Sequence, residues 1–269
     1  MVTDFDEYER RQWAGRAEAY GRTFASLCGH LAGPLLDAVG AGPGVRVLDV
    51  GTGPGTVAAL AVARGAVVTA VDAEPSMVAA AARRVPTATV GPGVLPDLPF
   101  PDGAFDAAVA NFVVNHVGDP RAAVAELVRV VRPGGRVAVT VWPYPAPELQ
   151  ALFGRAVEAA GAAGTVPMPR LDPEKDFART GEGLAGLFGA DVDEPEVRGV
   201  TWRHRTDMAA LWLGPASGIG SGGVLLAGQS PETAARIRRE YERLCAPYRE
   251  ADGLLAIPTA ALLGSTRRR

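Results

Sequence analysis

Between residues 45 and 142, short runs rich in β-branched residues alternate with stretches of helical periodicity. This alternation is typical of successive βα units, and it therefore predicts a parallel sheet with helices packed on its faces. Pro75 and Pro120 suit first helical turns, and the Pro133-Gly134-Gly135 turn is expected to end a helix and start a strand. The expected strands are 45–50, 67–71, 88–90, 105–111 and 136–142, and the expected helices are roughly 56–64, 75–84 and 120–131.

The segments on either side predict further helices and two more strands. Apolar residues at three-to-four-residue spacing predict two helices between residues 6 and 39. Past the alternating region we expect a helix at 147–160, a mobile stretch at 161–194, a strand at 197–205, helices at 207–213 and 232–246, and a last strand at 254–263. The glycine-rich run 214–228 would be a mobile lid or a slack connection. The fold class expected is α/β: a Rossmann-like, seven-stranded, mostly parallel sheet with helices on both faces, N-terminal helices and a helical insertion before the last strand.

Composition narrows the function classes. The 269 residues are 48% hydrophobic, which is enough for a full core, and no apolar run approaches the roughly 20 residues of a membrane span. The beginning MVTDFDEYERRQW is polar and acidic, unlike a signal peptide, so we expect a cytoplasmic protein. The 27 basic and 30 acidic residues are well mixed, which argues against nucleic acid or an anionic membrane as partner and favours a small molecule.

Two smaller features complete this survey. Cys28 and Cys245 stand far apart without the spacing of a zinc site or a disulfide framework, so we expect two buried apolar residues and no metal. The basic run 267–269 is expected to be a solvated, frayed tail. The oligomeric state, monomer or homodimer, stays open.

The stretch VLDVGTGPG carries the first functional signal. Gly51, Gly53 and Gly55 follow the first strand, so their backbone can turn tightly and approach a ligand. The dinucleotide fingerprint Gly-x-Gly-x-x-Gly would require glycine at position 56, where this chain has Thr56. Asp49 would repel a pyrophosphate but attract a ligand that carries an ammonium and a sulfonium group. S-adenosylmethionine is such a ligand.

Asp72 gives a second signal, because it ends the second strand in VTAVDAEPSM. A carboxylate at this place can accept hydrogen bonds from both hydroxyls of a ribose. The alternative is helix capping, and NAD-binding proteins also use an acid here. Asp72 therefore supports an adenosine ligand without choosing between the two cofactors.

Four stretches in order, VLDVGTGPG, VTAVDAEPSM, LPFPDGAFDAAVANFVVNHVGDP and ELVRVVRPGGRVAVTVW, make the chain resemble the class I S-adenosylmethionine-dependent methyltransferases. Within that family it is most similar to members of the ubiquinone/menaquinone-biosynthesis and natural-product small-molecule type. The resemblance covers roughly residues 13 to 142. It implies one methyltransferase domain over 1–269, with an N-terminal helical region (1–44), a cofactor-binding core (45–142) and a substrate side (143–269).

The resemblance also implies roles for individual residues. Gly51 and its neighbours would contact the methionine part of the cofactor, Asp49 would help to hold its amino group, and Asp72 its ribose. Ala73 and Met77 would flank the adenine, with backbone at Val94 and Leu95, and Asn111 and Phe112 would lie near the methionine part and the reacting methyl group. Tyr20 matches an aromatic residue that approaches the cofactor from an N-terminal helix in related enzymes. Relatives usually have an acid where this chain has Val94-Leu95, so adenine would be held there by backbone or by nearby Asp97. For Tyr20, a role in the core is an equal alternative.

The sequence constrains the reaction chemistry and the methyl acceptor less than it constrains the cofactor. His116 borders the methyl-transfer pocket in similar enzymes and is the candidate general base, with a structural histidine as the alternative. Trp142, Tyr144 and Trp212 are candidates for acceptor contacts, or ordinary core residues. The favoured function is methylation of a small molecule, a secondary metabolite or quinone-like acceptor, at oxygen, nitrogen or carbon. The alternatives are a methyltransferase-like scaffold that binds the cofactor but performs a cyclisation or regulates a partner, and an NAD-dependent oxidoreductase.

Overall fold

A seven-stranded sheet runs through the computed structural model, which describes residues 3–162, 169 and 171–269. The strand order is β3-β2-β1-β4-β5-β7-β6, and only β7 runs antiparallel to its neighbours. The strands are β1 (Arg46–Val50), β2 (Val67–Asp72), β3 (Thr89–Pro92), β4 (Phe105–Asn111), β5 (Val131–Val141), β6 (Glu196–Thr206) and β7 (Leu255–Arg267). The predicted fold class, and all seven predicted strands, are therefore confirmed.

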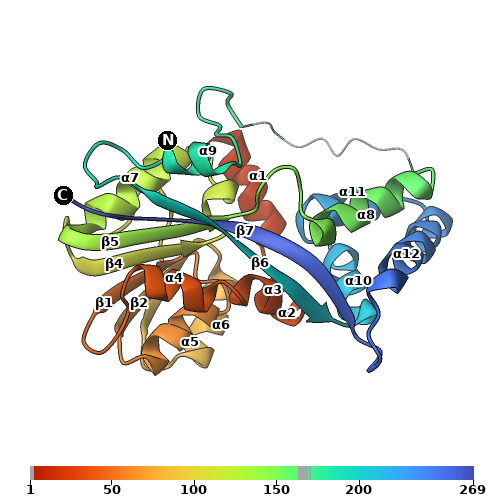
Figure 1. Cartoon of the computed structure of the whole chain (residues 1–269), viewed down its shortest axis with the longest axis horizontal. Helices are drawn as coiled ribbons and strands as arrows, with labels where there is room; N and C mark the ends of the chain where they lie inside the picture. The colour runs from red at the N-terminus through yellow and green to blue at the C-terminus, as the bar shows by residue number, and fades with distance from the viewer. Residues whose placement is uncertain (1–2, 163–168, 170) are drawn as a thin grey trace.

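Helices cover both faces of this sheet (Figure 1). One face carries α4 (Ala32–Ala38), α5 (Thr56–Ala63) and α6 (Pro75–Arg84), and the other carries α7 (Pro120–Val130) and α9 (Gly181–Ala185). Each face has its own buried cluster, since the side chains of a strand alternate between the two faces. Pro75 and Pro120 begin α6 and α7 as expected, each after an acid whose side chain caps the helix.

A third cluster lies beyond the ends of β6 and β7. There α8 (Glu148–Ala159) packs against α12 (Pro231–Cys245), close to α10 (Met208–Ala216) and α11 (Gly220–Ala227) (Figure 1). The short 3-10 turn η2 (Ala246–Tyr248) follows α12. Cys245 is buried in this third cluster. Cys28 is buried in the cluster on the sheet face that α4 and α5 cover, and both cysteines are therefore buried as the sequence predicted.

The N-terminal region departs from the prediction of two helices. It forms α1 (Asp4–Trp13), α2 (Ala17–Arg22), α3 (Phe24–Gly29) and α4. The left-handed Gly15 (φ +70°) separates α1 from α2, and Thr23, with ψ near −81°, separates α2 from α3. The apolar spacing in the sequence carries over these breaks, so it does not reveal them.

The glycine-rich run is neither a slack connection nor an open loop, because it holds the end of α10 and the whole of α11. A methyl group at Gly214 would lie 3.1 Å from the Phe24 ring, and one at Gly218 would lie 2.9 Å from the Arg16 guanidinium. These glycines therefore allow the insertion to approach α2 and α3 closely. Within the described residues no single helix is long and apolar enough to cross a membrane, and α10 and α11 reach that length and apolarity only as a pair bent by 71°.

Three further expectations are wrong or lie partly outside the described residues. The basic end is not a frayed tail: Arg267 belongs to β7, and the Arg268 guanidinium donates to the carbonyls of Val128, Arg129 and Val131. The turn at residues 133–135 lies within β5, which begins at Val131 and carries a register shift there. The stretch predicted to be mobile contains α9, and its residues 163–168 and 170 lie outside the described part.

Candidate active site

The turn after β1 is the centre of the candidate site. Gly51, Gly53 and Gly55 all have φ between +55° and +80°, a left-handed conformation that other residues rarely adopt. A methyl group at Gly51 would lie 2.4 Å from the side chain of Val113 in the loop after β4. The three glycines therefore leave the backbone without side chains where two strand ends and their loops meet. Open α/β sheets bind ligands at this edge.

Asp72 holds this turn from the neighbouring strand. Its carboxylate accepts from the amide of Gly53 at 2.8 Å and from the amide of Glu74 at 3.0 Å. Parallel pairing of β1 and β2 brings the ends of both strands together, and Asp49 pairs with Ala70 two residues before Asp72. Two acids are thus gathered around one glycine turn, and the field at this point favours a cation.

Asp49 is almost completely buried, with 1% of its surface exposed. One of its oxygens accepts from the Thr52 hydroxyl at 2.6 Å, whereas Oδ1 is buried without a hydrogen-bond partner in the described part of the chain. Burial is the largest cause of the rise in the pKa of the Asp49 carboxyl to about 7; the nearby Asp72 acts in the same direction, and the Thr52 hydroxyl acts against it. A buried acceptor without a partner is costly, so this oxygen favours a ligand that donates a proton or carries positive charge.

The raised pKa of Asp49 predicts a pH-dependent stability. The folded state keeps a proton that the unfolded chain releases near its ordinary pKa, so stability should fall as the pH rises from about 4 to about 7. Asp49→Asn removes this penalty and should be more stable relative to the native protein at pH 8 than at pH 4, by up to roughly 4 kcal/mol. Urea unfolding at the two pH values measures the difference. Asp37→Asn, at an exposed position, is the control, and an equal pH dependence in both variants would contradict the prediction.

The N-terminal helices cover the turn through aromatic side chains. A methyl group at Gly53 would lie 3.7 Å from the Tyr20 ring, so this ring stands over the backbone of the turn. Trp13 meets Tyr20 edge-on at 5.7 Å between ring centroids, and Tyr20 stacks with Phe24 at 6.1 Å. Burial raises the pKa of Tyr20 well above its usual value, which keeps the phenol neutral. Tyr20 therefore lies at the turn, as the resemblance implied, and is also packed like a core residue.

The end of β4 supplies a second wall. Asn111 is held in place, since its amide donates to the Cys28 carbonyl at 3.0 Å and its oxygen accepts from the Thr140 hydroxyl at 2.7 Å. Phe112 has φ +59°, uncommon for a side chain of this size, and its ring stacks on Trp142 with centroids 4.0 Å apart. Backbone strain of this kind is concentrated at functional sites, where the surroundings maintain it. The structure thus brings Asn111, Phe112 and Trp142 together.

His116 follows on the short helix η1 (Val114–His116), in the same loop as Val113. Its Nδ1 lies 2.8 Å from Oε2 of Glu9, and the Trp13 indole donates to that same oxygen at 3.2 Å. The ring of Trp13 also meets the imidazole edge-on at 5.3 Å. The sequence interpretation missed Glu9 because 107 positions separate it from His116, and its only local signal is the four-residue spacing to Trp13.

The residues implied beside the adenine lie along β2, α6 and the loop after β3. Met77 is buried on α6, whereas Ala73 is exposed just after β2. Leu95 is buried, and Val94, which is 41% exposed, accepts through its carbonyl from the Asp97 amide at 2.9 Å. The loop offers no side-chain acceptor at Val94 or Leu95, so backbone groups and Asp97 are the polar groups nearest to them in sequence.

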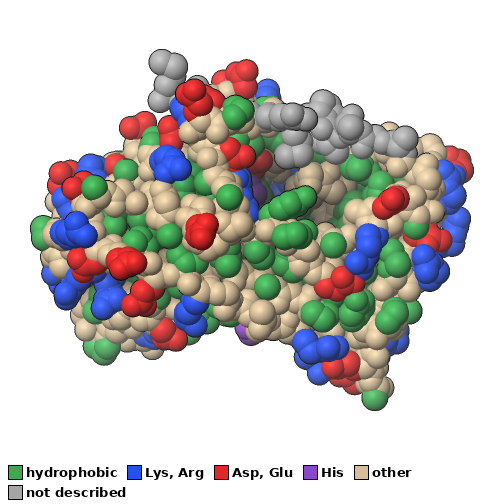
Figure 2. Space-filling view, turned by 45° about the horizontal axis from the view of Figure 1, so that its top comes forward, with side chains coloured by type: hydrophobic (Ala, Val, Ile, Leu, Met, Phe, Trp, Pro, Cys, Tyr) green, Lys and Arg blue, Asp and Glu red, His purple; other side chains and the backbone are tan. Residues whose placement is uncertain are grey.

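The three aromatic candidates for acceptor contacts are not brought together. Trp142 lies against Phe112, but Tyr144 is 75% exposed and Trp212 packs in the third cluster, beneath the Arg238 guanidinium. Figure 2 shows the surface hollowed between the part that carries the sheet and the part with α8 and α10–α12, with a histidine side chain visible in the hollow.

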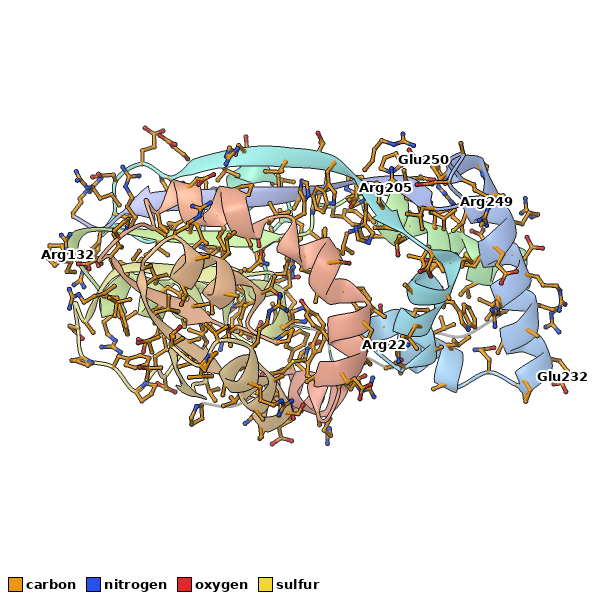
Figure 3. The ribbon with its side chains drawn as sticks, turned by 90° about the horizontal axis from the view of Figure 1, so that it is seen from below. Arg22, Arg132, Arg205, Glu232, Arg249 and Glu250 are labelled. Carbon is orange, nitrogen blue, oxygen red and sulfur yellow. The ribbon has the colours of Figure 1, made fainter. Side chains whose placement is uncertain are left out.

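Toward each end of the molecule, charged side chains form ion pairs with their own neighbours. Figure 3 places Arg132 at one end, and Arg205 beside Glu250 along the upper edge toward the other end. Arg132 lies 2.7 Å from the Asp106 carboxylate and Arg205 lies 2.8 Å from that of Glu250. These two arginines are paired with other acids, so neither of them neutralises Asp49 or Asp72 at the glycine turn.

Comparison with known proteins agrees with this geometry. Residues 48–139 match the family model described as a methyltransferase domain. This part of the chain therefore resembles a methyltransferase domain. It contains the glycine turn and Asp72, and it ends on β5.

Relatives of known name share this domain. The chain is 42% identical over 121 residues to the demethylmenaquinone methyltransferase of Beutenbergia cavernae, a match that covers 44% of this chain and 50% of the relative. It is 40% identical over 111 residues to the demethylmenaquinone methyltransferase of Renibacterium salmoninarum, covering 41% and 47%. The chain thus spans about half the length of the curated relatives it matches.

Solved structures share the fold over a longer stretch. The YcgJ protein of Bacillus subtilis superposes with a TM-score of 0.55 at 21% identity, covering 89% of this chain and 99% of that one. The Haemonchus contortus phosphoethanolamine N-methyltransferase 2, solved with phosphomonomethylethanolamine and S-adenosylhomocysteine, gives a TM-score of 0.56 at 17% identity and covers 100% and 61%. At these identities the likeness shows the fold alone.

Proposed function

We propose that the protein transfers a methyl group from S-adenosylmethionine to a small-molecule acceptor. The observation that carries this proposal is the pair of acids, Asp49 and Asp72, around a left-handed turn whose three glycines carry no side chain. Such a turn lets a ligand approach the main chain closely. The acids favour a cationic, phosphate-free ligand over a dinucleotide. The methyltransferase domain at 48–139 supports the same reading.

The chain's own residues fit this cofactor. Asp72 would hold the ribose hydroxyls, and the buried Oδ1 of Asp49, which lacks a partner among the described residues, would face the ammonium group directly or through a water molecule. Met77, Ala73 and backbone at Val94 and Leu95 would flank the adenine, and Tyr20 would close the turn from above. Asn111 acts through its bond to Cys28, which fixes α3 against β4 beside Phe112.

S-adenosylmethionine supplies an activated methyl group, so the protein chiefly has to align the acceptor and exclude water. Phe112, Trp142 and Trp13 give the site aromatic walls. Such walls suit a planar acceptor, and the names of the relatives make a quinol the first candidate. We therefore propose a phenol or quinol as the acceptor class.

Titration calorimetry with the full chain tests the proposed cofactor. S-adenosylmethionine and S-adenosylhomocysteine should each bind with measurable heat, whereas NAD should give none, because a pyrophosphate would lie beside two acids. Binding of NAD in place of S-adenosylmethionine would reject the methyltransferase function and return the site to oxidoreductase chemistry.

A further inference from the structure

We infer that Glu9 is a positioning residue that orients His116 as the proton acceptor of the reaction. This inference rests on the proposed function and extends it, because a directed base is needed only by an acceptor that loses a proton. Amines and ring carbons also lose a proton on methylation, so the base does not by itself select the acceptor; together with the proposed acceptor class it favours a phenol or quinol that is protonated at neutral pH.

The geometry around His116 fixes the imidazole in one orientation. Glu9 is buried, with 9% of its surface exposed, and its Oε2 lies 2.8 Å from Nδ1 of His116. A carboxylate can only accept, so Nδ1 carries the proton and Nε2 keeps its lone pair. Trp13 donates to the same carboxylate oxygen and packs edge-on against the imidazole, which restrains both partners.

The imidazole is partly exposed, and its loop contacts the glycine turn. Among the residues that the structure describes, Nε2 of His116 has no hydrogen-bond partner, and the side chain is 36% exposed. The loop that carries His116 touches the turn through Val113 and Gly51, and Trp13 links the imidazole to Tyr20 above Gly53. A base at this place can reach an acceptor aligned with the cofactor.

The proton and electron balance follows from this arrangement. The acceptor O–H bond breaks, its proton passes to Nε2 of His116, and its electron pair stays on oxygen. That oxygen forms the new bond to the methyl carbon, while the pair of the broken carbon–sulfur bond stays on sulfur and neutralises the sulfonium. Glu9 stabilises the imidazolium until it releases the proton to water, as a buried carboxylate does for a catalytic histidine.

Asp6 provides a matched control on the same helix. Like Glu9, it joins α1 to the loop after β4, since its carboxylate accepts from the Gly118 amide at 2.6 Å. It also accepts from the Thr3 hydroxyl, and among the described contacts it forms no hydrogen bond or ion pair with the imidazole. A variant at Asp6 should therefore loosen the helix without changing the orientation of His116.

Nitrogen NMR of the histidines tests the orientation without any acceptor. In the native chain at a pH where imidazoles are neutral, His116 should carry its proton on Nδ1, and Glu9→Gln should shift the population toward the Nε2 tautomer. Asp6→Asn should leave the His116 tautomer as it is, and His30 is the internal reference. A native His116 with its proton on Nε2 would overturn the inference, because no lone pair would then face the acceptor.

Rates with two probe acceptors test the chemistry. With 1-naphthol, which is protonated at neutral pH, Glu9→Gln should lower the methylation rate by about 100-fold. With 4-nitro-1-naphthol, which is already ionised, the rate should change little, and Asp6→Asn should affect both probes equally. An equal loss with both probes would make Glu9 a merely structural residue. If neither probe is methylated, the tautomer of His116 measured by NMR tests the role of Glu9. Failure of the proposed function would appear separately, as absent S-adenosylmethionine binding.

Discussion

Asp72→Ala should weaken the binding of S-adenosylmethionine by at least about 100-fold. The expected loss is that of two hydrogen bonds from ribose hydroxyls to the half-buried Asp72 carboxylate, each of which contributes about 1.5–3 kcal/mol. The variant also frees the Gly53 amide, so the glycine turn loses the bond that holds it at 2.8 Å. Titration calorimetry with S-adenosylhomocysteine measures the change without any acceptor.

A matched variant separates ribose binding from general loosening of the site. Glu74→Ala removes the cap of α6 and the contact with the Gly15 amide, but leaves the Asp72 carboxylate in place. It should therefore weaken binding much less than Asp72→Ala. Equal losses in the two variants would show that Asp72 acts only by shaping the loop, which would remove the main support for an adenosine ligand.

Gly51→Ala is expected to be the most damaging single methyl group that the site can receive. The residue would have to keep φ near +64°, and its methyl group would lie 2.4 Å from Val113. Left-handed backbone and overpacking together should cost roughly 3 kcal/mol of stability and abolish cofactor binding. Denaturant unfolding and calorimetry measure the two effects.

Gly40→Ala isolates the backbone part of that cost. Gly40 has nearly the same φ, +67°, but nothing lies within 4 Å of its added methyl group. Its loss should be about 1 kcal/mol. Gly51→Ala combined with Val113→Ala should recover part of the difference, because the clash is then relieved. Equal effects at Gly40 and Gly51 would mean that the loop after β4 does not press on the turn.

The sequence predicts the sheet well because its strands are local signals. Short runs rich in β-branched residues mark the strands between residues 45 and 142, and the proline and acid pairs mark the starts of α6 and α7. The breaks at Gly15 and Thr23 were not predicted, since an apolar face continues across a kink without a change of spacing. The helix α11 was missed because glycine is a poor helix former, and its glycines serve close packing instead.

The site is predictable where it depends on one strand end and its loop. Asp49, Gly51 and Asp72 meet because parallel strands end at one edge of the sheet, which the spacing of βα units already implies. The contact between Glu9 and His116 could not be predicted in this way, because it depends on how α1 docks on the loop after β4. The same holds for Asn111, whose amide turns to the Cys28 carbonyl on α3.

The position of Glu9 has a consequence for how activities are transferred between related chains. The shared domain spans residues 48–139, so it includes His116 but excludes the side chain that orients it. On the present proposals, evolution can exchange the helix before the domain and so add or remove base catalysis, while Asp49 and Asp72 are inherited with the matched residues. A chimera that carries α1 on the core of a relative would therefore acquire this protein's choice of acceptor separately from its cofactor site.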